Sequence, residues 1–313
     1  MDAAAKTVEW LRAELDVEDE WAVATDGGFR WWPGRHAQTI EVLADGAVSV
    51  RTEVMRGLDL WPPALPPLNH YLLQLASLSG GVYDGEQRRM DLCSLVRVGD
   101  ENADAVRPLL RLAASLQADE ARLLAGQLAA TLGAEAAESG HPERGVRAEP
   151  HAIAGTVDEF IDVKYEKTSA WSEDEIRRTF EHDLDESLAA GGSRDGAGFT
   201  TEFRCGRSIS ICYVRADQPH PRYGPGLFLL QTLPLSPADE EGGVELALFF
   251  NGRDLVRGPL GDLGLGSYAF REGGLYFTSF FPNALHRRGL LADAYTSCAQ
   301  RAAGVGEVLA EAR

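Results

Sequence analysis

Apolar side chains on both faces of one short strand constrain the fold of this chain more than any other feature. The stretch GSYAFREGGLYFTSFFPN, residues 266–283, is typical of two strands joined by a Gly273-Gly274 turn. Side chains alternate between the faces of a strand, so the second strand presents two rows: Leu275, Phe277 and Phe281 on one face, and Tyr276, Thr278 and Phe280 on the other. One hydrophobic core can bury only one row. The other row needs a helix, a second domain, a partner subunit or a bound peptide to cover it.

Length and composition favour two ordinary globular domains. The chain has 313 residues, 44% of them hydrophobic and 25% charged, which suits two domains of roughly 150 residues. No window approaches the ~20 apolar residues of a membrane span, and no signal-peptide layout is visible, so we expect a cytoplasmic protein. The composition, rich in Ala, Gly and Arg, suggests a bacterial source. The four cysteines (Cys93, Cys205, Cys212 and Cys298) form no CxxC pair, which argues against a disulfide framework or a zinc site.

The chain is strongly acidic. It has 48 Asp and Glu residues against 30 Lys and Arg, a formal net charge of −18, and such a field repels phosphate backbones. We therefore expect no nucleic-acid partner. Two interpretations stay open: the charge serves solubility, or it attracts a basic protein partner.

Turn signals and apolar periodicity give an order of elements for the first half. A helix is expected over residues 3–15, and a strand meander follows it with turns at Gly27-Gly28 and Asp45-Gly46. A Pro-rich segment at 61–67 ends the sheet run, and a short helix with Leu68, Leu72, Leu75 and Leu78 stops at Gly80-Gly81. A hairpin over 82–98 and a helix over 105–133 complete the order α-βββ-α-ββ-α.

The second half shows a similar order. A capping box at Ser172 and Glu175 begins a helix whose apolar stripe is Ile176, Phe180, Leu184 and Leu188, with Gly191-Gly192 as its stop. Strands are expected at 199–205, 207–214, 227–233 and 244–250, with at most one helical turn at 251–258. In the second of these strands, Ile209, Ile211 and Tyr213 lie opposite Ser208, Ser210 and Cys212. The hairpin at 266–283 and a helix over 291–309 follow.

The repeated order indicates an internal duplication. The closest local echo is GGVYDGEQRRMDLCSL against LGSYAFREGGLYFTSF, in which Tyr83 and Tyr268 correspond. Residues 134–171 mix Gly, Pro and charge without a period, although TVDEFIDVKYEK at 156–167 has the composition of a packed strand. We predict an α+β fold of two similar sheet-and-helix domains related by a pseudo-two-fold, at 1–135 and 171–313, joined by a linker at 136–170.

Motifs for catalysis are missing from the sequence. There is no G-x-S-x-G elbow, no metal-ligand spacing among the seven histidines, and no P-loop lysine in the glycine-rich tracts. The best cluster is EHDLDES, with His182, Asp183, Asp185 and Glu186, and we interpret it as a solvated helix face rather than an acid–base or metal site. We therefore expect no enzyme activity, no metal and no cofactor.

The order of elements resembles the peptide-binding chaperone-like superfamily of type III secretion chaperones and YbjN-like proteins. The segment most similar to that family is FNGRDLVRGPLGDLGLGSYAFREGGLYFTSFF, residues 250–281. The resemblance implies small acidic α+β units that hold an extended client segment on apolar sheet and helix surface, here as a tandem copy that forms a built-in pseudo-dimer. A very short middle helix in the second half and a long linker depart from the family's pattern.

The expected function is non-covalent capture of a client protein or peptide, by a monomer or a homodimer with no membrane partner. The candidate binding residues are Tyr268, Phe270, Tyr276 and Phe280, with Trp31 or Trp32 contributing from the first domain. Other interpretations remain: one Trp and the second aromatic row are covered inside the molecule, or the chain is an immunity or regulatory protein that neutralises a basic effector. A third is an enzyme whose inter-domain site draws on His182, Asp185 or His220.

Overall fold

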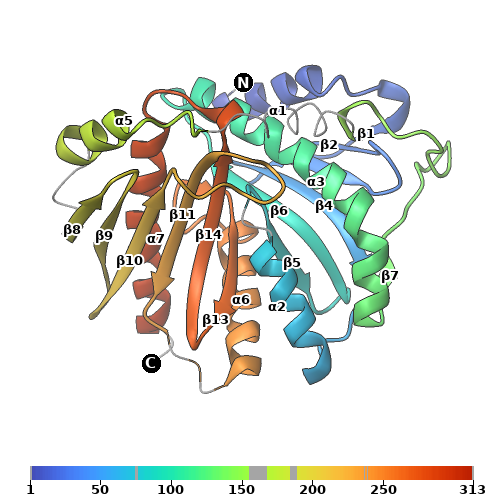
Figure 1. The fold of residues 1–313 in the computed structure, drawn as a ribbon. Coiled ribbons are helices and arrows are strands. Elements are labelled where there is room, and N and C mark those ends of the chain that lie inside the picture. Colours follow the sequence, from blue (N-terminus) through green and yellow to red (C-terminus); the bar gives the residue numbers. More distant parts are fainter. Residues whose placement is uncertain are drawn as a thin grey trace.

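Two antiparallel sheets, each packed with helices, make up the protein in the computed structural model (Figure 1). The structure describes residues 2–74, 77–154, 168–183, 189–235, 237 and 239–311. The predicted α+β class is confirmed.

The first half contains three helices around a sheet. The helices are α1 (Ala3–Glu14), α2 (Leu65–Gln74) and α3 (Ala103–Leu132); the strands are β1 (Ala22–Ala24), β2 (Gly28–Trp31), β3 (Gln38–Val42), β4 (Ala47–Arg56), β5 (Gly80–Asp84) and β6 (Arg89–Arg97). The spatial order is β1-β2-β3-β4-β6, with β5 also paired to β6 and the short β7 (Glu135–Ala136) paired to β4. The helices α1 and α3 cover one face of this sheet.

The second half repeats this arrangement. Its helices are α5 (Glu173–Arg178, continuing as a π-helical turn over Thr179–Asp183), α6 (Glu240–Leu255) and α7 (Leu290–Glu311); its strands are β8 (Ala189–Asp195), β9 (Gly198–Cys205), β10 (Ser208–Arg215), β11 (Gly226–Leu233), β12 (Leu263–Gly264), β13 (Ser267–Arg271) and β14 (Gly274–Pro282). The strand order β13-β14-β11-β10-β9-β8 matches β5-β6-β4-β3-β2-β1 strand for strand. The two echoing sequence segments form equivalent hairpins, β5–β6 and β13–β14, so the predicted duplication is confirmed. Four strands, rather than three, precede each middle helix.

The prediction of a strand at 244–250 is wrong, because these residues lie inside the 16-residue helix α6. The Asp239 side chain accepts a hydrogen bond from the Gly242 amide and caps this helix. A Cβ atom at Gly243 would lie 2.4 Å from the Phe270 ring, so the glycine permits close contact with β13. With a full-length middle helix, the second half no longer departs from the order of the first.

The Gly191-Gly192 pair does not end a helix, because it lies in β8. The predicted stripe residues Leu75, Leu184 and Leu188 and the segment 156–167 lie outside the described residues.

The described part of the predicted linker packs along the first half. Backbone hydrogen bonds join Ala137 to Val54 (2.9 Å), Ser139 to Arg35 (2.8 Å) and His151 to Pro33 (2.7 Å). Residues 136–154 therefore belong structurally to the first half.

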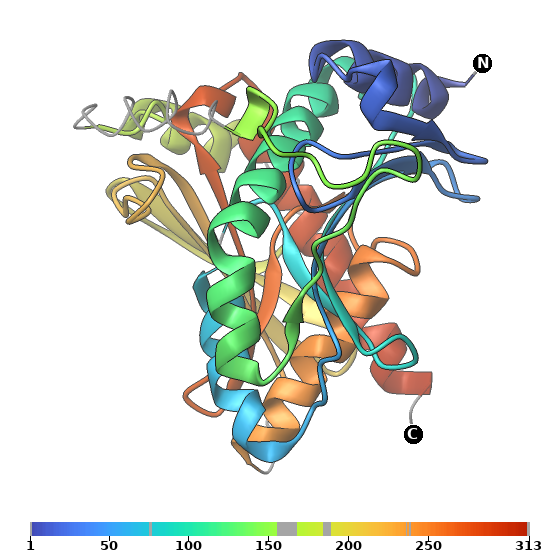
Figure 2. The ribbon, with the colours of Figure 1, turned by 90° about the vertical axis from the view of Figure 1, so that its right-hand side faces the viewer.

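The middle helices α2 and α6 lie against each other where the halves meet (Figure 2). Each carries an asparagine that binds the backbone of the edge strand β13. Asn69 of α2 pairs with the Phe270 amide and carbonyl at 2.9 and 2.7 Å. Asn251 of α6 does the same for Tyr268 at 2.9 and 3.1 Å. These side chains satisfy a sheet edge that would otherwise be open to pairing.

Each half also adds backbone to the sheet of the other. The short strand β12 pairs with β6, where Leu263 faces Val96 and Gly264 faces Leu95. In return, the Ser77 carbonyl accepts a hydrogen bond from the Phe280 amide at 3.1 Å.

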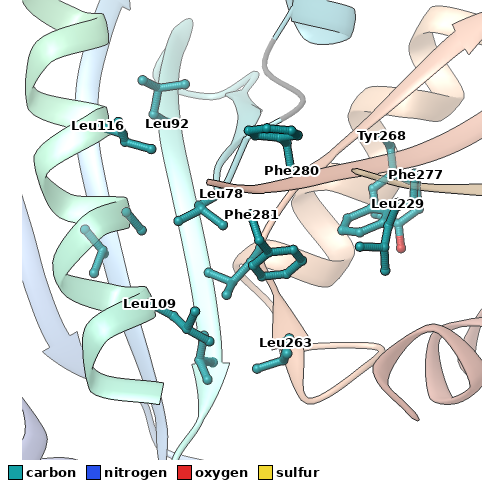
Figure 3. Close-up of a cluster of buried hydrophobic side chains, with 14 of the residues drawn as sticks. Leu78, Leu92, Leu109, Leu116, Leu229, Leu263, Tyr268, Phe277, Phe280 and Phe281 are labelled. Atoms are coloured by element: carbon teal, nitrogen blue, oxygen red, sulfur yellow. The ribbon is translucent and has the colours of Figure 1, made fainter. Parts of the chain in front are cut away.

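One large hydrophobic cluster runs through both halves, and a smaller one joins Val82 and Cys93 to Leu255. In Figure 3, Phe280 and Phe281 project from opposite sides of β14, with Phe281 directed towards Leu78 and the side of α3 that carries Leu109. Leu275, Phe277 and Phe281 are all buried. The sister half therefore supplies part of the cover that the final hairpin requires.

Candidate functional site

On one face of the second sheet, the side chains of β10 are not covered by a helix of the described chain, whereas α2 and α3 lie near the β14 end of that face. The helix α7 packs behind the sheet against β9 and β11, and the opposite face is turned towards the viewer in Figure 1. The apolar side chains on this surface, which we call the open face, are Ile209, Ile211, Tyr213, Phe228, Leu230 and Tyr276. Ile209 is 42% exposed and Tyr213 37% exposed; the other four are half-buried.

The strand β10 faces the core with its less apolar row. Ser210 and Cys212 are fully buried, whereas Ile209 and Tyr213 point outwards. The Ser210 hydroxyl is accommodated because it donates to the Thr232 carbonyl (2.7 Å) and accepts from Gln231 Nε2 (3.0 Å). Folding alone would favour the opposite orientation, so the exposed row is not explained by burial.

A cavity of about 570 Å³ adjoins the open face. Its walls come from α2 and α3 of the first half, and its other side from the loop at 218–223 with Phe228 and Phe280. Phe228 belongs to both the cavity and the open face, so the two form one continuous surface.

The loop beside the cavity is held by a His-Pro-x-x-Gly turn. The backbones of His220 and Gly224 exchange two hydrogen bonds of 2.8 and 3.0 Å, and Gly224 adopts a φ of +69°. The sequence repeats this pattern at His141 and Gly145, which exchange the same bonds at 2.8 and 2.9 Å. The repeated pattern is a signal that the sequence analysis missed.

This turn fixes the imidazole of His220 in the cavity wall. The ring stacks on Tyr223 at 4.6 Å and lies 5.0 Å from the Phe280 ring. Burial, assisted by the positive charge of Arg222, lowers the pKa of His220 to about 4. Nδ1 of the neutral ring accepts hydrogen bonds from the backbone amides of Arg222 at 3.1 Å and Tyr223 at 3.2 Å. These bonds assign the ring proton to Nε2.

A buried carboxyl group lies at the junction of the halves. The Tyr223 hydroxyl donates to Glu120 Oε1 at 2.8 Å, and Arg222 Nη1 lies 3.8 Å from the same oxygen. Burial raises the pKa of Glu120 to about 7, against the lowering effects of Tyr223 and Arg222. The neighbouring Asp119 is paired with both Arg122 and Arg222.

Two buried oxygen atoms in the cavity lining lack a partner. Glu120 Oε2 and the Tyr71 hydroxyl make no hydrogen bond with any described residue. Glu120 and Tyr71 are only 3% and 5% exposed, so both oxygens lie in the buried part of the lining.

Four of the predicted binding residues lie in the interior. Trp31 donates to Gln38 Oε1 (3.0 Å) and Trp32 to Ser139 Oγ (3.1 Å), and both are buried. Tyr268 donates to Asp254 Oδ2 (2.8 Å), and Phe270 is buried between α2 and α6. These four side chains have structural contacts and present almost no surface to a partner, because the helices and the packed linker cover them.

The other two predicted residues do lie at the site. Tyr276 is half-buried on the open face, and Phe280 lines the cavity although it is only 1% exposed. Of the three residues named for an enzyme, His220 lines the cavity, His182 is exposed and does not line it, and Asp185 lies outside the described residues.

The described residues contain no group of three or more His, Cys, Asp or Glu that could hold a metal ion, and no helix among them is long and apolar enough to cross a membrane. Comparisons of the chain with protein-family models, with curated proteins and with solved structures find no match.

Proposed function

We propose that this protein captures an extended segment of a client protein on the open face, without catalysis, in the manner of the chaperone-like superfamily that its order of elements resembles. The observation that carries the proposal is the orientation of β10, which exposes Ile209 and Tyr213 while it buries Ser210 and Cys212. Exposed apolar surface of this kind, next to a cavity, is typical of an interaction site.

The geometry suits an extended peptide. Along β10, every second side chain reaches the open face, and Tyr213 lies across from Leu230, which in turn faces Thr278. A strand-like ligand also projects alternate side chains to one side, so its apolar residues match this spacing. Tyr213 and Tyr276 can contribute strongly once a partner removes them from water. The duplicated chain would act in the cytoplasm as its own pseudo-dimer.

Short random peptides displayed on phage provide the test. Tyr213→Ser and Ile209→Ser should abolish selection while the melting temperature stays close to that of the wild type, because both side chains are substantially exposed. Trp61→Ser is the matched control, since Trp61 is 53% exposed and does not line the cavity. Undiminished selection by the Tyr213 and Ile209 variants would refute the proposal.

One observation favours an acid–base enzyme as a second candidate. Glu120, with its pKa raised by burial to about 7, and the neutral His220 line the same cavity, and such shifted groups are common in active sites. Against this, the described lining residues include no Ser, Thr, Cys or Lys that could act as a nucleophile. In the native host, an enzyme would lose its function in Glu120→Gln and keep it in Tyr213→Ser, whereas a capture protein would lose it in Tyr213→Ser.

A third alternative, neutralisation of a basic effector, is suggested by the net charge of −18. It predicts that partner capture weakens steeply as salt is added.

A further inference from the structure

We propose that the cavity beside the open face binds a basic side chain, Lys or Arg, of the client segment, and that Glu120 determines this specificity. The inference rests on the proposed function and adds a chemical preference to it. It follows from the unpartnered oxygens, the local charge pairing and the continuity of the cavity with the open face.

Neither Glu120 Oε2 nor the Tyr71 hydroxyl receives a hydrogen bond from a residue that the structure describes. Glu120 Oε2 has only acceptor capacity when ionised, and the Tyr71 hydroxyl can accept as well as donate. Both residues line the cavity and are buried, and no described residue donates a hydrogen bond to these oxygens. A ligand group that brings N–H donors, after a small shift of the side chains, would satisfy them.

The charges favour a cationic donor over a neutral one. Arg222 is directed mainly to Asp119, which is also paired with Arg122 at 2.6 Å. Glu120 is left with the neutral Tyr223 hydroxyl at hydrogen-bond distance and with Arg222 only at 3.8 Å. A cationic group bound here would favour the ionised form of Glu120, whose pKa burial raises to about 7, and the net charge of −18 draws basic segments towards the protein.

The remaining lining suits the stem of a long side chain. Leu123, Phe228 and Phe280 supply apolar surface for methylene groups, and the rings can contact a cation. A cavity of about 570 Å³ has room for one such side chain. Because Phe228 also belongs to the open face, a peptide anchored here continues towards Leu230 and Tyr213.

Phage-displayed random peptides, selected in parallel on the wild type and on Glu120→Gln, test the inference. Gln keeps an oxygen for the Tyr223 hydroxyl but removes the charge. Wild-type selections should be rich in Lys or Arg between alternating apolar residues, and those on Glu120→Gln should keep the apolar pattern and lose the basic residue. A selected Lys peptide should bind Glu120→Gln more than about tenfold more weakly, and its Lys→norleucine form should bind both proteins alike. Glu86→Gln, on the exposed turn between β5 and β6 and away from the cavity and the open face, is the matched control and should select like the wild type.

The outcomes separate the two proposals. Wild-type peptides that are apolar but lack Lys and Arg, or basic enrichment that persists in Glu120→Gln, would overturn the basic anchor and leave peptide capture standing. A wild type that selects no peptide would overturn peptide capture and the anchor with it. A melting curve for Glu120→Gln at the pH of selection verifies that the variant is folded.

Discussion

Replacing Glu120 with Gln should change how the stability of the protein depends on pH. Burial raises the pKa of Glu120 from an ordinary value of 4.5 to about 7. A raised pKa in the folded state means that the folded protein holds a proton which the unfolded chain releases between these values. The contribution of Glu120 to stability is therefore fully present below pH 4.5 and is lost as the pH rises through 7.

The size of this effect follows from the shift. At about 1.4 kcal/mol per pKa unit, the wild type should lose about 2–3 kcal/mol of Glu120's contribution between pH 5 and pH 8. The groups that face Glu120 are Asp119, Arg222, Tyr223 and Tyr71. His220, whose lowered pKa acts with the opposite sign below pH 6.5, is present in both proteins and largely cancels in the comparison.

Urea unfolding at pH 5, 6, 7 and 8 measures the effect. The free energy of unfolding of Glu120→Gln, relative to the wild type, should rise by about 2–3 kcal/mol from pH 5 to pH 8. Glu86→Gln, on the exposed turn after β5, is the matched control, and its curve should keep the wild-type slope. A difference between Glu120→Gln and wild type that stays constant with pH would show that Glu120 titrates alike in the folded and unfolded states.

Three further substitutions test the packing between and within the halves. Asp254→Ala should cost about 3–5 kcal/mol in urea unfolding, because it removes the charge partner of Arg301. Arg301 is 1% exposed and donates to Asp254 Oδ2 at 2.9 Å. Replacing Arg301 by Met and Asp254 by Leu together should restore much of the loss, and no recovery would contradict this account. Asn69→Ala should cost about 1–3 kcal/mol, because the amide and carbonyl of Phe270 lose their partners, and an unchanged melting temperature would show that this edge does not need them. Phe281→Ala should cost about 3–5 kcal/mol in the same unfolding assay, since its ring fills the core between the halves; a loss below about 1 kcal/mol would mean that the ring is not tightly packed there.

The sequence predicted those parts of the fold whose signals are local. Turn glycines and alternating apolar residues identified the β13–β14 hairpin, and the repeated order of elements identified the duplication. The helix α6 was missed because its apolar residues contact β13 on one side and β5 on another, so no single apolar stripe marks its period. Asp239, followed by Glu240 and Glu241, was the available helix signal.

The site was harder to predict because segments far apart in the sequence form it. Tyr71, Glu120 and Tyr223 come from α2, α3 and the β10–β11 loop, and only the meeting of the halves brings them together. A carboxylate in a Leu- and Ala-rich helix ordinarily faces solvent, so nothing in the local pattern marks Glu120 as buried. The alternation in β10 predicted the two rows of that strand correctly, but an alternating pattern alone cannot tell which row faces the core.

The backbone exchanged between the sheets has a consequence for synthesis on the ribosome. Leu95 and Val96 of β6 can pair with Gly264 and Leu263 only after these residues have left the ribosome. The Ser77 carbonyl likewise gains its hydrogen bond only after Phe280 has been synthesised. At translation rates of about 5–20 residues per second, the nascent first half spends on the order of ten seconds with this edge unpaired. The backbone pairing between the sheets can therefore form only once both halves have been synthesised. An amino-terminal half released early would expose the unpaired edge of β6, which could pair with another chain.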